Sequence, residues 1–142
     1  MDLSKYGISI DNKDLQVALT HTSYANEHNI QSNERIEFLG DSVLGFLVAE
    51  YIYINFPNLT EGKMSKLRAT YVCENANAKY GKELKIDELI LLGRGEELTG
   101  GRRKDTVIND AFESFIGALY LTNGIDDVRK ILEKVVFPHI KA

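Results

Sequence analysis

The stretch from residue 36 to residue 54, IEFLGDSVLGFLVAEYIYI, constrains the fold most, because it carries only three charged side chains, Glu37, Asp41 and Glu50. Helical spacing puts apolar residues on almost every side of this stretch, and a helix that is apolar nearly all round is buried. Its uncharged run ends at Glu50, well short of the roughly 20 apolar residues that a membrane span requires. The sequence therefore predicts a long helix inside a domain, not a membrane span.

The remaining sequence is also dominated by helical periodicity. Few segments alternate with period two, and none is flanked by an Asn-Gly or Asp-Gly turn. No repeat, linker or low-complexity run divides the 142 residues. The expected helices cover residues 12–28, 33–56, 60–72, 74–84, 105–122 and 126–136, with a glycine-rich loop at 92–104. We expect one all-α domain over residues 1–142, with Asn33 and Thr60 as helix caps.

Three acidic side chains share one face of the long helix. At about 100° per residue, Glu34 and Asp41 lie within about 60° of Glu37. The same face continues as Leu44 and Val48, so the acids extend an inward-facing stripe. Burying an ionised carboxylate is unfavourable by several kcal/mol unless a cation or metal compensates it. These acids therefore need a partner.

A second helix repeats the arrangement, with Asp110 and Glu113 close together on one side. Gly117 continues that stripe and would let another helix approach closely. Two such helices would form a four-carboxylate pocket, and oxygen ligands without histidine or thiolate favour Mg²⁺, with Mn²⁺ as a substitute. The alternative is a solvated helix face or a set of ion pairs with the basic residues Arg102, Arg103 and Lys104.

The distribution of charge along the sequence indicates whether a nucleic acid could be a binding partner. The chain has 17 basic and 21 acidic residues, a net charge of −4, which would ordinarily disfavour a nucleic acid. Residues 61–104, however, carry a local charge of +3. Four of their basic side chains are candidates for a phosphate backbone: Lys63, Arg102, Arg103 and Lys104. The single cysteine, Cys73, and an N-terminus without a signal-like segment predict a cytoplasmic location.

Several ordered motifs resemble those of the ribonuclease III catalytic domain. Residues 33–44 read NERIEFLGDSVL, which differs from the commonest family signature only at Ile36. Residues 19–24, LTHTSY, and 61–69, EGKMSKLRA, resemble two further family helices. The Gly-Gly-Arg at 100–102 precedes the acidic pair of 110–113 as it does in the family. Asn109, where alanine is more common, and Ser114 depart from the pattern without removing an acid.

The resemblance implies a site and a fold. It makes Glu37, Asp41, Asp110 and Glu113 the catalytic and metal-binding carboxylates. Glu34 and Glu61 match supporting positions of the family, and Phe38 matches a residue that packs across the interface of its homodimer. The implied fold is the all-helical ribonuclease III endonuclease domain, working as a homodimer.

The resemblance also implies an activity, the cleavage of double-stranded RNA to 5′-phosphate and 3′-hydroxyl ends with short 3′ overhangs, in rRNA and mRNA processing. Most bacterial relatives continue into a double-stranded-RNA-binding domain. We expect none in this chain, which would be an isolated catalytic domain or a natural short form.

Two alternatives differ in chemistry. Helical bundles rich in carboxylates also hold di-iron centres, but those use Glu-x-x-His pairs, and neither acidic pair here is followed by such a histidine. The second is a ribonuclease III-like fold that binds RNA without cutting it. The four intact carboxylates favour the enzyme.

Overall fold

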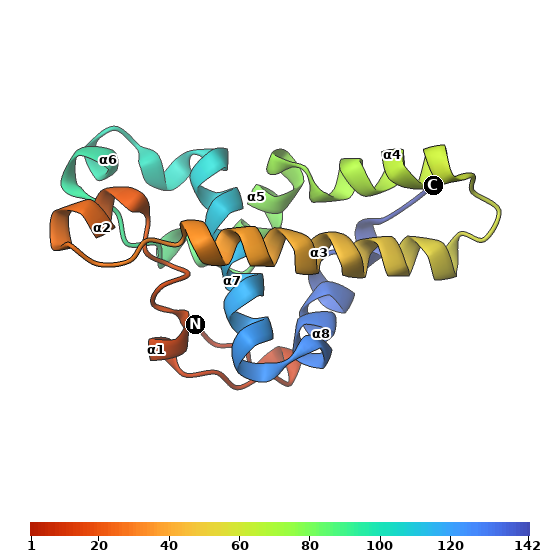
Figure 1. The fold of residues 1–142 in the computed structure, drawn as a ribbon, viewed down its shortest axis with the longest axis horizontal. Helices are drawn as coiled ribbons and strands as arrows, with labels where there is room; N and C mark the ends of the chain where they lie inside the picture. The colour runs from red at the N-terminus through yellow and green to blue at the C-terminus, as the bar shows by residue number, and fades with distance from the viewer.

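The computed structural model describes residues 1–142 and confirms the all-α prediction (Figure 1). The α-helices are α1 (Asn12–Leu15), α2 (Thr22–His28), α3 (Glu34–Asn55), α4 (Glu61–Val72), α5 (Glu74–Glu83), α6 (Arg94–Leu98), α7 (Asp105–Asn123) and α8 (Ile125–Val135). Single 3-10 turns are η1 (Ser4–Tyr6), η2 (Ile86–Glu88), η3 (Gly101–Arg103) and η4 (Phe137–His139). None of the helices combines the length and the apolarity needed to cross a membrane.

The two acid-bearing helices, α3 and α7, cross steeply near the middle of the molecule (Figure 1). Glycines lie at the crossing on both sides. A Cβ on Gly40 would overlap the backbone carbonyl oxygen of Glu113, and a Cβ on Gly117 would lie 2.6 Å from the carbonyl oxygen of Ile36. The backbones are therefore in direct contact, as expected at Gly117, while the role of Gly40 emerges only here. This contact fixes the position along α3 at which the acidic pair of α7 faces the acidic pair of α3.

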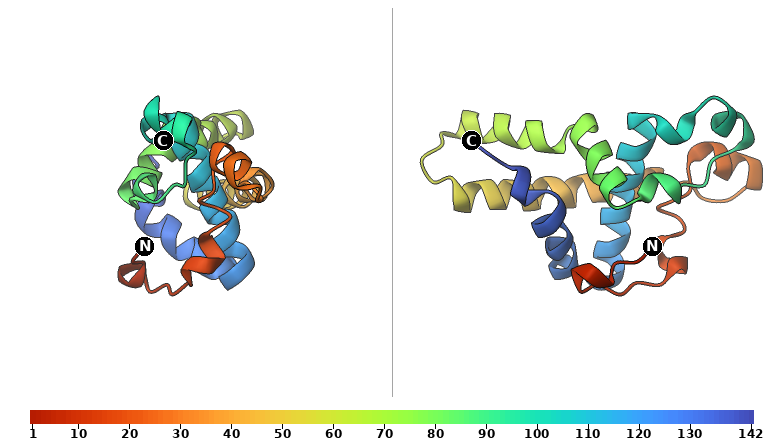
Figure 2. Two further views of the ribbon diagram at one scale, coloured as in Figure 1. Left: turned by 90° about the vertical axis from the view of Figure 1, so that its left-hand side faces the viewer. Right: turned by 180° about the vertical axis from the view of Figure 1, so that it is seen from behind.

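The remaining helices surround this crossing. α4 runs alongside the C-terminal half of α3, whereas α2 and α6 lie at the opposite end of the molecule (Figure 2). α5 packs against α7, and α8 follows α7 back along the core. From Val107 to Leu119, α7 is buried except at Asn109 and Asp110. The only break in the buried length of α7 thus lies where its acidic pair begins.

The single helix expected over residues 12–28 is wrong, because the chain forms α1 and α2 with a break between them. At the break, Thr20 pairs with Leu91 in an isolated parallel bridge, and Leu91 N–H donates to the carbonyl of Leu19 at 2.8 Å. His21 then starts a new helix, since its Nδ1 accepts a hydrogen bond from the backbone N–H of Ser23. Helical spacing on both sides of a break is indistinguishable from one helix in the sequence.

The two predicted cap residues, Asn33 and Thr60, directly precede α3 and α4, but only Thr60 caps its helix as expected. Thr60 accepts a hydrogen bond from Lys63 N–H and caps α4. Asn33 precedes α3 but is buried, and its side chain donates instead to the carbonyl of Ala18 at 3.2 Å. The region expected as a loop, residues 92–104, contains α6 and η3. Gly100, at φ +82°, makes the turn between them.

Candidate functional site

Three of the four predicted carboxylates meet at the crossing of α3 and α7. Glu37 lies on the first turn of α3, and Asp110 and Glu113 lie one turn apart on α7. One carboxylate oxygen from each residue lies within 4.8 Å of the others. Glu113 is buried, at 6% exposure, while Glu37 and Asp110 are half-buried. We call Glu37, Asp110 and Glu113 the acidic cluster.

The fourth carboxylate, Asp41, lies at the edge of this cluster. It is one turn after Glu37 on α3, and its proximity helps to raise the pKa of Glu113. Asp110 lies across from Glu37 on the other helix and likewise helps to raise the pKa of Glu37. Asp41 is exposed, so the expectation of four buried acids is wrong in this respect. This face of α3 becomes buried only after Asp41, where Leu44 and Val48 are fully buried.

The pKa values of all three acids of the cluster are raised. Burial, followed by repulsion from Asp110 and Asp41, raises the pKa of Glu37 to about 7. Burial and the neighbouring acids raise the pKa of Glu113 to about 9, and burial raises the pKa of Asp110 as well. No basic side chain forms an ion pair with any of these acids. The acids therefore repel one another, and a bound cation would relieve that repulsion.

Asparagine side chains that the sequence did not single out as functional contact the cluster. Asn109 Nδ2 donates to Asp110 at 2.9 Å and lies 3.4 Å from Glu113. Asn77 on α5 in turn donates to Asn109 at 2.8 Å. The position of Asn109, four residues before Glu113 on one helix, is a signal that the sequence offers for the first contact. Nothing in the sequence points to Asn77, because α5 reaches α7 only through the tertiary fold.

Two further acids, expected to support the site, lie outside the cluster. Glu34 is exposed on the first turn of α3, where its charge helps to raise the pKa of Glu37. Glu61 begins α4, which follows the far half of α3, and shares a surface cavity with Phe46 and Tyr53. Within one chain, the structure thus brings Glu34 near the cluster and leaves Glu61 away from it.

The four basic candidates for RNA contact have different environments. Arg102 is held internally, since its Nη1 donates to the carbonyls of Asp87 and Ile90 and its remaining nitrogens bind Glu97. Those bonds give Arg102 a structural role and leave it few donors for a ligand, contrary to expectation. Lys104 pairs with Glu96 at 2.8 Å. Arg103 and Lys63 are exposed.

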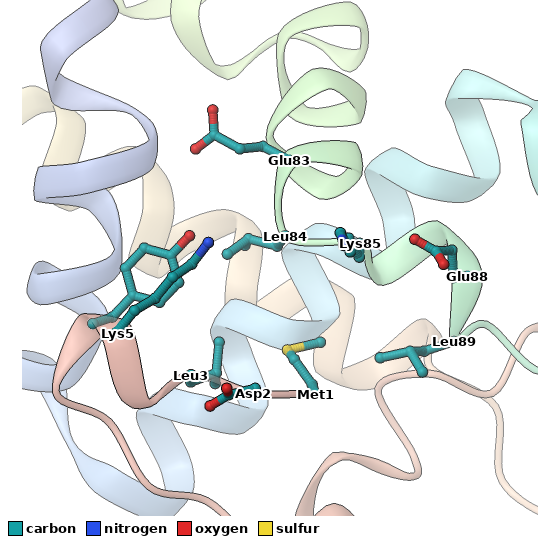
Figure 3. Close-up of a pocket in the computed structure, with 10 residues that line it drawn as sticks. Met1, Asp2, Leu3, Lys5, Glu83, Leu84, Lys85, Glu88 and Leu89 are labelled. Carbon is teal, nitrogen blue, oxygen red and sulfur yellow. The ribbon is translucent and has the colours of Figure 1, made fainter.

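Other hollows of the surface lack the chemistry of the cluster. A cavity of about 380 Å³ lies between the N-terminal segment and the end of α5, where Lys5, Glu83 and Lys85 are spread over its wall (Figure 3). None of the predicted site residues lines it. Only the acidic cluster brings several carboxylate oxygens close together, and hard divalent cations prefer such oxygens as ligands. A hard divalent cation therefore fits the residues of the cluster.

Sequence comparisons place these observations in a family. Residues 11–140 match the family model described as ribonuclease-III-like. The chain is 50% identical over 141 residues to Ribonuclease 3 of Geobacillus kaustophilus and 51% identical over 142 residues to Ribonuclease 3 of Halalkalibacterium halodurans. These alignments cover 96% and 97% of this chain but only 57% and 54% of the relatives. The chain thus spans little more than half the length of these relatives.

Solved structures agree with the sequence comparison. The nuclease domain of ribonuclease III from Campylobacter jejuni superposes with a TM-score of 0.86 at 37% identity, covering 95% of both chains. Dicer from Pichia stipitis superposes with a TM-score of 0.69 at 29% identity, covering 92% of this chain and 56% of Dicer. With the family model matched over nearly the whole sequence, this chain belongs to the ribonuclease-III-like family.

Proposed function

We propose that this chain is a divalent-metal-dependent endoribonuclease that hydrolyses double-stranded RNA. The observation that carries the proposal is the acidic cluster, in which three carboxylates without a cationic partner converge within 4.8 Å. Structural acids are normally paired or solvated, whereas mutually repelling acids are typical of a site that receives a cation. The relatives named Ribonuclease 3 and the Dicer structure support RNA as the substrate.

The residues of the site divide the work of hydrolysis between them. Glu37, Asp110 and Glu113 would hold Mg²⁺ or Mn²⁺, and Asp41, close to Glu113, would add a fourth carboxylate at the edge of the site. When bound, the ion supplies charge stabilisation at the phosphate and lowers the pKa of a coordinated water. The crossing of α3 and α7 keeps the acids at fixed separation, so little reorganisation is needed when the substrate arrives.

The proposed reaction breaks one phosphodiester on each strand. Water adds to phosphorus, the bond from phosphorus to the 3′ oxygen breaks, and that oxygen takes up a proton. The products carry a 5′-phosphate and a 3′-hydroxyl, with short 3′ overhangs on a duplex. The biological substrates would be duplex regions of rRNA and mRNA precursors. The likeness of this chain to a ribonuclease III nuclease domain supports this reaction.

The test is a cleavage assay on a labelled RNA duplex, with Mg²⁺, with Mn²⁺ and with a chelator. We expect cleavage with either ion, none with the chelator, and a loss on the order of 10³-fold in Asp41→Asn. Glu133→Gln, which changes an exposed acid on α8, serves as the matched control and should cut normally. Cleavage that persists in the chelator would refute metal dependence. Duplex binding without cleavage would favour the non-enzymatic alternative.

We propose that the RNA lies along the side of the cluster that carries Arg103 and Lys104. Arg103 ends the η3 turn, and Lys104 links that turn to α7, which bears Asp110. Lys104 is already paired with Glu96, so Arg103 is the more available side chain. Lys63, on α4, would contact a more distant part of the duplex.

The exposed aromatic side chains of α3 support a homodimer. Phe38, Phe46 and Tyr53 are 79%, 57% and 71% exposed, and their spacing places them within about 80° of one another around α3. Leu121 on α7, 64% exposed, lies beside Phe46 across a shallow hollow. An apolar surface of this kind is typical of a protein interface. A twofold dimer would place two equivalent sites on the two strands of an RNA duplex.

Light scattering at micromolar concentration tests the dimer. We expect a mass twice that of one chain for the parent protein, and at least a tenfold weaker association for Phe38→Ala, because buried aromatic anchors dominate interface energies. Leu98→Ala is the control, since Leu98 is 86% exposed on α6, away from α3. A monomeric mass for the parent at this concentration would contradict the proposal.

A further inference from the structure

Two side-chain amides link α5 to the acidic cluster. Asn77 is fully buried on α5, and its Nδ2 donates to the carbonyl of Val72 at 3.1 Å and to Asn109 Oδ1 at 2.8 Å. Asn109 Nδ2 donates to Asp110 Oδ1 at 2.9 Å and lies 3.4 Å from Glu113 Oε1. The end of α4 is thereby joined through α5 to both acids of α7.

The direction of every hydrogen bond in this chain follows from its ends. The carbonyl of Val72 can only accept, so Asn77 must turn its nitrogen toward it. That nitrogen also faces Asn109, which must therefore present its oxygen to Asn77. Asn109 is left with its nitrogen toward the carboxylates, which accept when ionised. Reversing either amide would place two acceptors or two donors face to face.

We propose that Asn77 and Asn109 are positioning residues that hold Asp110 and Glu113 in the orientation that receives a divalent cation. The proposal rests on the proposed function, since it concerns the same acids. One N–H of Asn109 is available to each carboxylate, and each carboxylate keeps a second oxygen for the ion. Hydrogen bonds of this kind to ligating groups tune metal affinity.

The environment of Asn77 argues that its role extends beyond packing. Its Oδ1 is buried without any hydrogen-bond partner, the one such side-chain atom in the structure. A buried unpartnered oxygen is unfavourable for folding. Core packing alone would therefore favour an apolar side chain at this position. The amide nitrogen of Asn77, however, fixes the orientation of Asn109. Removing Asn77 should accordingly weaken metal binding more than it weakens the fold.

The experiment measures Mn²⁺ binding, by the loss of the free-ion electron paramagnetic resonance signal, together with the melting temperature without metal. We expect about tenfold weaker Mn²⁺ affinity for Asn109→Ala. For Asn77→Ala we expect a loss of several-fold with a small change in melting temperature. Asn123→Ala is the matched control, because it removes an amide of α7 that donates to the carbonyl of Ser9 and to Asp127 at the C-terminal end of the helix, and it should leave Mn²⁺ affinity unchanged.

The double variant distinguishes a relay from a general loss of packing. If Asn77 acts through Asn109, adding Asn77→Ala to Asn109→Ala weakens Mn²⁺ affinity no further. An independent, multiplied loss in the double variant would overturn the proposal, as would unchanged affinity in both single variants. A parent protein that binds no Mn²⁺ would instead refute the proposed function, so the two failures are separate.

Discussion

Glu113→Gln is expected to abolish duplex cleavage while making the metal-free protein more stable at pH 8. Cleavage should fall on the order of 10³-fold, because the amide cannot replace an anionic metal ligand. The melting temperature in a chelator should rise by about 5 °C, since glutamine keeps the shape of the side chain and, unlike Glu113 at pH 8, takes up no proton on folding. Activity and stability thus change in opposite directions.

The stability gain follows from the pKa of Glu113 in the metal-free protein. Burial and neighbouring acids raise it to about 9 from the usual 4.5, so the folded chain binds a proton that the unfolded chain releases. Its contribution to stability is complete below about pH 4.5 and is lost as the pH rises through about 9. The melting temperature of the parent should therefore fall between pH 5 and pH 9 more steeply than that of Glu113→Gln.

Circular dichroism melts in a chelator, repeated across this pH range, measure the difference. Glu133→Gln removes an exposed acid from α8 and should leave the pH profile of the parent unchanged. Saturating Mg²⁺ should stabilise the parent most at high pH, where the acids are ionised, and should stabilise Glu113→Gln much less. A variant that melts below the parent at pH 8 would show that the Glu113 charge does not oppose folding.

Gly40→Ala is expected to disrupt the crossing of α3 and α7. The added methyl would overlap the backbone carbonyl of Glu113, and backbone on both sides leaves no flexible side chain to move aside. Overpacking usually destabilises by about 1–3 kcal/mol, and an overlap with backbone belongs at or above the upper end of that range. We expect at least about 3 kcal/mol of lost stability in urea denaturation, with impaired metal binding in any folded fraction.

Gly45→Ala provides the matched control, because Gly45 lies on the same helix and, apart from that helix's own backbone and the adjacent residues, nothing lies within 4 Å of the position that a Cβ would take. Alanine favours the helix interior over glycine by about 0.8–1.0 kcal/mol, so this variant should be as stable as the parent or more stable. Equal denaturation midpoints for the two variants would mean that the Gly40 contact does not govern the helix crossing.

The sequence predicted the helices that bear the site, and the reasons are local. The apolar run around Leu44 and Val48 requires burial, and both residues are fully buried in α3. Thr60 caps α4 through a hydrogen bond to a residue three positions away, which spacing alone can identify. The break between α1 and α2 was missed because Thr20 pairs with Leu91, a partner that no local pattern indicates.

Residue types and their spacing by themselves determined which side chains we propose as the site, since the acidic pairs recur at helical intervals on two largely apolar helices. Only the tertiary structure decided how these acids meet. The contact at Gly40 sets the separation of the acids, and Asn77 reaches the site from α5 by donating to Asn109. Arg102 donates to backbone carbonyls instead of facing a ligand. Such contacts join residues far apart in the chain, and their energies depend on the packing of whole helices, which periodicity does not encode.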